Sequence, residues 1–331
     1  MNVRERFKAV FDFRKPDRLP MIEWAYWWDK TVRNWESQGM PNGMDRHGLF
    51  DFFGLDMHHQ FSPSIRSDGF PGPQRHGGAV LRDKTDYDLL KGKLYGRENI
   101  RRAAQEIKGV EPMHSRGETA VWITLEGFFW YPRTLFGIES HLTAFYDYPD
   151  LMHEMNGDLL AFNIEAIDEI CKITKPDFMT FAEDMSYNNG PMCSKGMFDE
   201  FMAPYYRKIV PVLKENGVKI FIDTDGFVEP MIPWFMEVGI EGILPLERQA
   251  GVDVNRIRAN YPDFLIIGAF DKMEMRKDKE AMRAEFDRIL PAMRSGGYIP
   301  GVDHQTPPDV SLESYWDYLS LLKEYAEKAV N

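Results

Sequence analysis

The chain has little of several features that would place it in other protein classes. Its 331 residues include only 2 cysteines, Cys171 and Cys193, so the sequence offers no disulfide framework. No stretch approaches the ~20 apolar residues that a membrane-spanning helix needs. The N-terminal stretch "MNVRERFKAVFDFRKPDRLP" is charged throughout and has no apolar signal-peptide core. We therefore expect a protein of the reducing cytoplasm.

Basic residues are also fewer than acidic ones. The chain carries 40 Lys and Arg against 52 Asp and Glu, a formal net charge of −12. Nucleic acids and anionic membrane surfaces would repel such a chain, so we expect neither as a partner. Hydrophobic residues make up 44% of the sequence, enough for a large core. Because no repeat, low-complexity tract or linker interrupts it, we predict one domain over residues 1–331.

Strands and helices alternate regularly in the second half of the chain. Short apolar runs without polar alternation are typical of parallel strands buried on both faces. We predict such strands at 178–184, 218–226, 241–247, 264–270 and 298–304, with helices between them and after the last. The helix at 194–217 has Ser194 as its expected N-cap and Gly217 as its end.

The first half supplies three more predicted strands, at 18–24, 53–59 and 120–127. With the five above they make eight, and we predict an α/β fold of the (β/α)8 TIM-barrel type. The Gly-, Pro- and charge-rich segment 64–88 predicts a loop or hairpin excursion near the barrel mouth. Two helices broken around Pro149 are expected before the strand at 178–184.

Ionisable side chains follow every predicted strand. In barrel enzymes the active site lies at the carboxyl ends of the strands. A ring of carboxylates repels itself unless protons or a cation neutralise it, so this pattern favours a metal, a cationic ligand or a cationic side chain. Each acid taken alone could instead cap a helix or pair with a neighbouring basic residue. The residues concerned are Glu23, His58, His59, Glu126, Glu183, Asp184, Asp223, Asp225, Glu247, Asp271, Asp303 and His304.

Aromatic residues cluster in "IEWAYWWDKTVRNW" and "EGFFWYPRTLFG". They favour core packing or a pocket for a flat apolar ligand, and the sequence leaves both open.

Several segments, in order along the chain, resemble the uroporphyrinogen decarboxylase superfamily. They are "RERFKAVFDFRKPDRLPM", "LFGIESHLTAFYDYPDLMHEM", "EDMSYNNGPMCSKGMFDEFMAPYYRKIVPVLKENG" and "GGYIPGVDHQTPPDVSLESY". The resemblance implies a (β/α)8 barrel. It also implies either decarboxylation or methyl transfer to a corrinoid protein, since the superfamily contains both kinds of enzyme.

The resemblance is closer to the methyltransferase branch. The decarboxylases carry an arginine-rich "RQAGR"-type segment where this chain reads "EWAYWWDKTVRNW", and their "FSD"-type aspartate is matched only by "FSP" at 61–63. The methyltransferases bind zinc through an H-x-C pair and a later cysteine, and the similar positions here are Asp223, Asp225 and His304. Oxygen ligands make a harder metal site, which favours an oxygen-bearing substrate.

The expected activity is an O-demethylase-type methyl transfer from a small, methoxylated aromatic substrate. We expect Zn²⁺ as cofactor. The corrinoid comes from a partner protein, because no segment is left over to bind it; a folate carrier is the alternative acceptor. The alternative activity is a decarboxylase or lyase for a small aromatic or heterocyclic acid, with Asp225 or His304 as metal-free proton donor. A non-catalytic binding protein is a third interpretation, and a homodimer is left open.

The expected site residues fall into three groups. The expected metal ligands are Asp223, Asp225, Glu247 and His304. The expected catalytic residues are Asp225, His304 and Glu183. The expected substrate-binding residues are Glu23, Trp24, Tyr26, Trp27, Glu126, Phe128, Trp130 and Tyr187. The lyase alternative predicts basic residues in the same pocket, with Arg66, Arg75, Arg133 and Arg248 as candidates.

Overall fold

The structure, a computed structural model, describes residues 1–331 and is built around one curled parallel sheet. Its seven strands lie in the order β1-β2-β3-β6-β7-β8-β9, each hydrogen-bonded in parallel to the next. The strands are β1 (His58–Phe61), β2 (Ala120–Glu126), β3 (Phe178–Ala182), β6 (Lys219–Thr224), β7 (Gly242–Pro245), β8 (Leu265–Phe270) and β9 (Tyr298–Val302). The α/β barrel-type fold expected from the sequence is confirmed.

The predicted strand at 18–24 is wrong, since the structure has no strand over these residues. Pro20 has no N–H to donate to a ladder, and the Met21 amide donates to the side chain of Asp56 at 2.9 Å. Two of the backbone donors that a strand needs are therefore lost. The predicted strand at 53–59 begins only at His58, since 46–53 is helical.

Segment 18–24 nevertheless occupies the eighth position, between β9 and β1. On one side, the Met21 carbonyl accepts from the Asp56 amide, shortly before β1, at 2.8 Å. On the other side, Trp24 Nε1 donates to the carbonyl of Val302 in β9 at 2.6 Å. The gap between the two outer strands is thus bridged by chain that contacts both.

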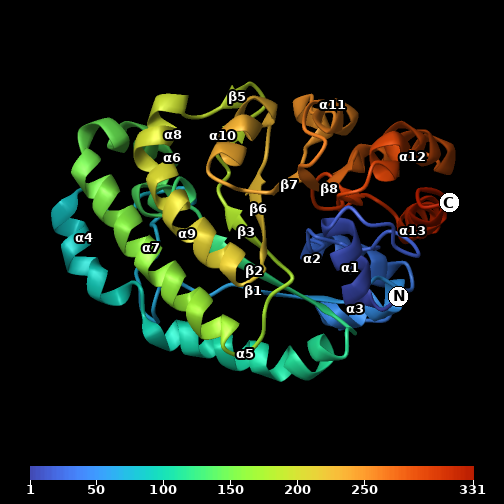
Figure 1. Ribbon diagram of the computed structural model, residues 1–331, viewed down its shortest axis with the longest axis horizontal. Helices are drawn as coiled ribbons and strands as arrows, with labels where there is room; N and C mark the ends of the chain where they lie inside the picture. Colours follow the sequence, from blue (N-terminus) through green and yellow to red (C-terminus); the bar gives the residue numbers. More distant parts are fainter.

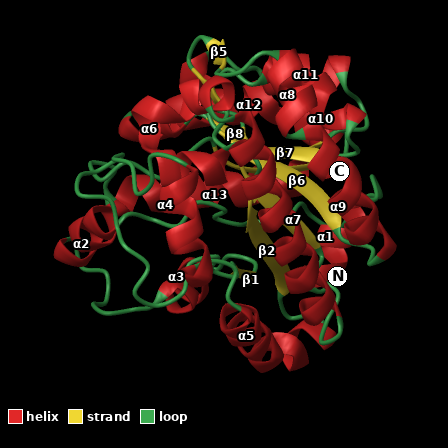
Figure 2. Ribbon diagram, turned by 90° about the vertical axis from the view of Figure 1, so that its left-hand side faces the viewer, coloured by secondary structure: helices red, strands yellow, loops and turns green.

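Helices surround the sheet in both ribbon views (Figures 1 and 2). The longer ones are α5 (Arg97–Ser115), α6 (Trp130–Asp147), α7 (Pro149–Cys171), α9 (Ala203–Glu215), α12 (Lys279–Arg294) and α13 (Leu312–Lys328). The shorter ones are α1 (Val3–Phe11), α2 (Asp29–Ser37), α3 (Arg46–Phe53), α4 (Lys84–Leu90), α8 (Lys195–Phe201), α10 (Ile232–Glu237) and α11 (Val254–Asn260). Four 3-10 helices are η1 (Lys91–Lys93), η2 (Glu229–Met231), η3 (Arg248–Ala250) and η4 (Lys272–Arg276).

The beginning and the end of the chain lie side by side in Figure 1. Trp35 Nε1 of α2 donates to the Val310 carbonyl at 2.9 Å, and Leu19 N donates to the carbonyl of Ala326 in α13 at 3.1 Å. None of the helices combines the length and apolar character needed to cross a bilayer.

Local signals placed several elements correctly. Ser194 caps α8, its hydroxyl accepting from the Met197 amide at 3.1 Å, and Gly217 follows α9 with φ of +73°. The helix expected at 194–217 is divided between α8 and α9 at Met202. The excursion at 64–88 is a loop that ends in the start of α4, and the hairpin alternative is wrong. A small hairpin, β4 (Ser186–Tyr187) with β5 (Gly190–Pro191), follows β3 instead.

Candidate functional site

The barrel interior is apolar at one end and polar at the other. Trp122 stacks on Phe178 with ring centroids 5.1 Å apart, and Phe178 contacts Phe221 at 5.8 Å. Phe11 of α1 packs against Phe178 and Phe221, so α1 lies under this end of the barrel. These rings identify the inward face of β2, β3 and β6.

The same inward face becomes polar and partly exposed towards the carboxyl ends of the strands. Thr124, Ala182 and Asp223 are partly exposed, whereas their outward-facing neighbours Leu125 and Ile222 are buried. Inward residues of a filled barrel would be fully buried, so solvent reaches the interior from this end. The carboxyl end of the sheet is therefore an open mouth, where barrel enzymes place their active sites.

Three predicted site residues meet at this mouth. Asp225 follows β6, Glu247 follows β7 and His304 follows β9, and one ligand atom from each lies within 4.8 Å of the others. His304 Nε2 is 3.7 Å from Asp225 Oδ2. We call these three residues the acid–histidine cluster.

The backbone around the cluster explains how the three strand ends converge. Gly226 has φ of +82°, and a Cβ there would lie 2.5 Å from the Tyr187 backbone, so only glycine fits this turn. The Gly226 amide then donates to Glu247 Oε2 at 2.9 Å, which ties the end of β6 to the end of β7.

The cluster is acidic enough to perturb its members. Burial, followed by the charges of the neighbouring acids Asp184 and Glu247, raises the pKa of Asp225 to about 7, against an opposing effect of Lys272. Burial, together with the charge of Lys272, lowers the pKa of His304. The surroundings thus disfavour the ionised carboxylate of Asp225 and the protonated imidazole of His304. A bound cation would stabilise the ionised carboxylate.

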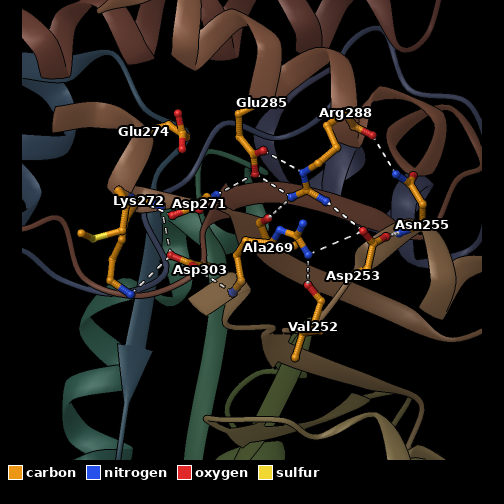
Figure 3. Close-up of polar contacts among 12 residues, drawn as sticks. Val252, Asp253, Asn255, Ala269, Asp271, Lys272, Glu274, Glu285, Arg288 and Asp303 are labelled. Carbon is orange, nitrogen blue, oxygen red and sulfur yellow. Dashed lines mark hydrogen bonds and ion pairs between the residues drawn. The ribbon is translucent and has the colours of Figure 1, made fainter. Parts of the chain in front are cut away.

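Asp303 holds the backbone on which the cluster stands, and Figure 3 shows its contacts with Lys272. This buried carboxylate accepts from the amides of Arg248 at 2.9 Å and Lys272 at 3.1 Å, and so caps the 3-10 helices that follow β7 and β8. Lys272 Nζ lies 3.5 Å from Asp303 and 4.0 Å from Glu247 Oε1. Lys272 is the cation beside the cluster, and the sequence did not single it out.

The fourth predicted ligand, Asp223, lies inward on β6 but outside the cluster. Its side chain makes no hydrogen bond, although its carbonyl accepts from the Glu183 amide at 2.9 Å. Burial, followed by the charges of Asp184 and Asp225, raises the pKa of Asp223 well above its ordinary value. Asp223 therefore holds its proton more tightly than an ordinary aspartate, and it lies at the mouth without joining the other three residues.

Glu183 points away from the mouth. Ala182 pairs in register with the inward Asp223, so the next residue faces outward. Its carboxylate accepts from the amides of Phe128, Phe129 and Trp130, each between 2.8 and 2.9 Å, and from the Tyr206 hydroxyl. These contacts occupy it as the N-terminal cap of α6, so we leave it out of the site.

Glu23 also faces outward. Its Oε2 accepts from the Tyr315 hydroxyl of α13 at 2.9 Å, and Oε1 is buried without a partner. Burial raises the pKa of Glu23 to about 8.

The predicted aromatic residues do not form one wall. Phe128 is buried against Tyr205 and Tyr206, and Trp27 is buried among Trp35, Phe50, Phe53 and Tyr315, so both are core residues. Tyr26 stacks on His58.

The other three aromatic candidates lie nearer the mouth. Trp24 lies 3.6 Å from where a Cβ of the inward Gly301 would be. Trp130 is partly exposed under the guanidinium of Arg133, 5.1 Å from the ring centre. Tyr187 is half exposed in the β4–β5 hairpin, its backbone against Gly226.

The predicted substrate residue Glu126 ends β2 on the inward face. Its Oε2 is buried without a hydrogen-bond partner, and burial raises its pKa to about 7. Arg66 opposes this shift but makes no ion pair with it; its guanidinium donates to the Thr134 carbonyl at 3.0 Å. Glu126 and Asp225 lie at the ends of β2 and β6, which are separated in the sheet by β3.

Comparison with known proteins identifies a family. The family described as uroporphyrinogen decarboxylase (URO-D) matches residues 117–325. No curated protein matches the chain.

Two solved structures share a distant similarity of shape. A B12-independent methionine synthase from Shewanella sp. W3-18-1 is 13% identical, with a TM-score of 0.41, covering 67% of this chain and 65% of that one. A putative vitamin-B12 independent methionine synthase from Listeria monocytogenes is 12% identical, with a TM-score of 0.46, covering 95% and 98%. Similarity at this level bears on neither activity nor substrate.

Proposed function

The chain belongs to the uroporphyrinogen decarboxylase family, and we propose that it is a metal-dependent methyltransferase. The substrate is a small methylated compound, in the first place a methoxylated aromatic. The acceptor is a reduced corrinoid carried by a separate protein. The single observation that carries this proposal is the acid–histidine cluster at the barrel mouth, with its three ligand atoms within 4.8 Å of one another.

The donor set suits a divalent cation such as Zn²⁺. Two carboxylates and one imidazole are the ligand types of catalytic zinc sites, which keep a further position open for substrate. Asp303 adds a third carboxylate beside a single ammonium, that of Lys272, so negative charge is in excess here. When bound, the metal supplies Lewis acidity towards the oxygen that carries the methyl group.

The protein residues supply placement and charge balance. The Gly226 amide and Asp303 hold the strand ends so that Asp225, Glu247 and His304 converge. In the transfer, the C–O bonding pair stays on the substrate oxygen, which takes a proton from solvent, and the acceptor's electron pair forms the new bond to the methyl carbon. The spare N–H groups of Lys272 are placed to stabilise charge that develops on that oxygen.

A decarboxylase or lyase for a small aromatic or heterocyclic acid is the second candidate, favoured by the activity in the name of the matched family. It requires a cation for the substrate carboxylate. The basic residues that support it are Lys272, Arg133 and Arg66, the last of which acts on Glu126. Arg75 instead pairs with Glu139 at the surface, and the Arg248 side chain donates to the Val252 carbonyl.

Metal analysis separates the two candidates. Purified protein should contain about one metal ion per chain, lost together in Asp225→Ala and His304→Ala, whereas the lyase needs no metal. Demethylation should then be measured with reduced corrinoid protein across methoxylated and N-methylated compounds. A metal-free protein with both residues intact, or no turnover of any methyl donor, would contradict the methyltransferase.

A further inference from the structure

A ladder of hydrogen bonds crosses the inward face of β1, β2 and β3 beneath the mouth. Trp122 Nε1 donates to Thr180 Oγ1 at 2.9 Å. Thr180 and Thr124 share a hydrogen bond at 3.0 Å, and Gln60 Nε2 donates to Thr124 Oγ1 at 2.7 Å. The ladder thus brings four polar side chains together in the barrel interior, below the mouth.

Some donors and acceptors of the ladder have no hydrogen-bond partner in the protein. Thr180 is fully buried and has no acceptor other than Thr124, so its hydroxyl proton goes to Thr124. Thr124 Oγ1 then accepts from both Thr180 and Gln60, and its own proton has no acceptor in the protein. Thr124 and Gln60 are both partly exposed. The ladder therefore presents one free donor, the Thr124 hydroxyl, and one free acceptor, Gln60 Oε1, to the open interior.

Glu126 follows Thr124 by two residues on β2, nearer the mouth, and adds a second acceptor. Side chains two residues apart on a strand share a face, so both lie inward on β2. The buried Oε2 of Glu126 lacks any partner, which is costly for a carboxyl group unless something in the site completes it.

These groups lie across the mouth from the acid–histidine cluster. The ladder occupies β1, β2 and β3, whereas the cluster stands on the ends of β6, β7 and β9. In a curled sheet of this order, β2 faces the side that carries β7 and β8. A substrate with one end at the cluster would direct its other end towards Thr124 and Glu126.

We propose that Gln60, Thr124 and Glu126 form a recognition subsite for an uncharged group with both a donor and an acceptor, such as a hydroxyl or a carboxamide. This group stands on the substrate at the end remote from the methyl ether. The inference rests on the proposed function for the position of the methyl group. The subsite excludes a substrate with a carboxylate at the end remote from the methyl ether, because Glu126 would repel that carboxylate.

Four probes test the subsite by binding alone: anisole, 4-methoxyphenol, 4-methoxybenzamide and 4-methoxybenzoate. They share the methyl ether and differ in the group at the opposite end of the ring. Dissociation constants are measured by ligand-observed NMR at about pH 8, with and without added ZnCl2, without any corrinoid. The phenol and the benzamide should bind at least about tenfold more tightly than anisole, and the benzoate no more tightly.

Two variants locate the effect. Thr124→Val and Glu126→Gln should each bring the phenol within about threefold of anisole, while Thr143→Val, a matched change on the exposed face of α6, should leave the preference intact. Glu126→Gln conserves shape, so it still gives a result if Thr124→Val fails to fold, as checked by circular dichroism.

Equal binding of anisole and the phenol, tightest binding of the benzoate, or a preference that survives both variants would overturn the subsite. So would the absence of measurable binding by all four probes. Zinc content, measured on the same preparations, reports on the proposed function separately. Loss of metal binding or of methyl transfer with an intact phenol preference would count against the methyltransferase and not against the subsite.

Discussion

His304 Nε2 lies 3.7 Å from Asp225 Oδ2, although the two residues follow different strands, β9 and β6. This separation is too long for a direct hydrogen bond and suits two ligands of one ion. Added Zn²⁺ should therefore raise the melting temperature of the metal-free protein, with a gain of about 2.7 kcal/mol at a hundredfold excess over Kd. Asp225→Asn and His304→Gln should each remove most of this gain in calorimetry. An equal zinc effect in both variants would contradict the site.

Asp303→Asn should weaken zinc binding although Asp303 is not a proposed ligand. The buried carboxylate holds the Arg248 and Lys272 amides, and an asparagine can present only one acceptor oxygen to the two. Outer partners of metal ligands are worth about 10- to 100-fold in affinity. Competition with a chromogenic chelator measures this loss.

The control for Asp303 is Asp309→Asn, which alters an exposed carboxylate that pairs with Arg276 at the surface. It should leave zinc affinity unchanged. Unchanged affinity in Asp303→Asn as well would show that the cluster does not depend on this support.

The strands carrying the site could be read from the sequence because parallel strands covered on both faces are continuous apolar runs. This is why β2, β3 and β6 to β9 were placed correctly. The convergence of Asp225, Glu247 and His304 follows from the same topology, since the carboxyl ends of parallel strands meet on one side. Their role as ligands, the zinc, the corrinoid partner and the single-domain boundary remain predictions.

The presence of ionisable residues at the strand ends did not predict which way their side chains point. Glu183 and Asp223 both end strands, yet one faces outward and the other inward, because the register pairs Asp223 with Ala182. Strict alternation along β2 and β3 would also have identified Thr124 and Thr180 as inward polar residues. Aromatic residues were less predictable, because Phe128 and Trp27 pack into the core with the same chemistry that a ligand wall would use.

Glu23→Gln should stabilise the protein at alkaline pH. The pKa of Glu23 is about 8 in the folded protein, against 4.5 for an ordinary glutamate side chain. A carboxyl with a raised pKa binds its proton more tightly when folded, so its contribution to stability is complete below about pH 4.5 and is lost as pH rises towards 8. The free energy of unfolding of the wild type should fall across this window more steeply than that of Glu23→Gln.

At about pH 8 the Glu23 variant should be the more stable by roughly 1–3 kcal/mol in urea denaturation. Glu327→Gln, on the exposed side of α13, is the matched control and should follow the wild type. Parallel pH profiles for the wild type and Glu23→Gln would show that the Glu23 proton does not contribute.

Glu183→Gln should cost stability and leave zinc binding unchanged. The wild-type carboxylate accepts three backbone amides at the start of α6, and the glutamine Nε2 would instead oppose at least one of these N–H groups. We expect a loss of about 1–3 kcal/mol in urea denaturation, whereas Glu200→Gln on the exposed face of α8 should lose almost nothing. Zinc affinity and the preference for 4-methoxyphenol over anisole should match the wild type. A variant of normal stability that loses zinc or the ligand preference would return Glu183 to the site, and would mean that the α6 cap is not its role.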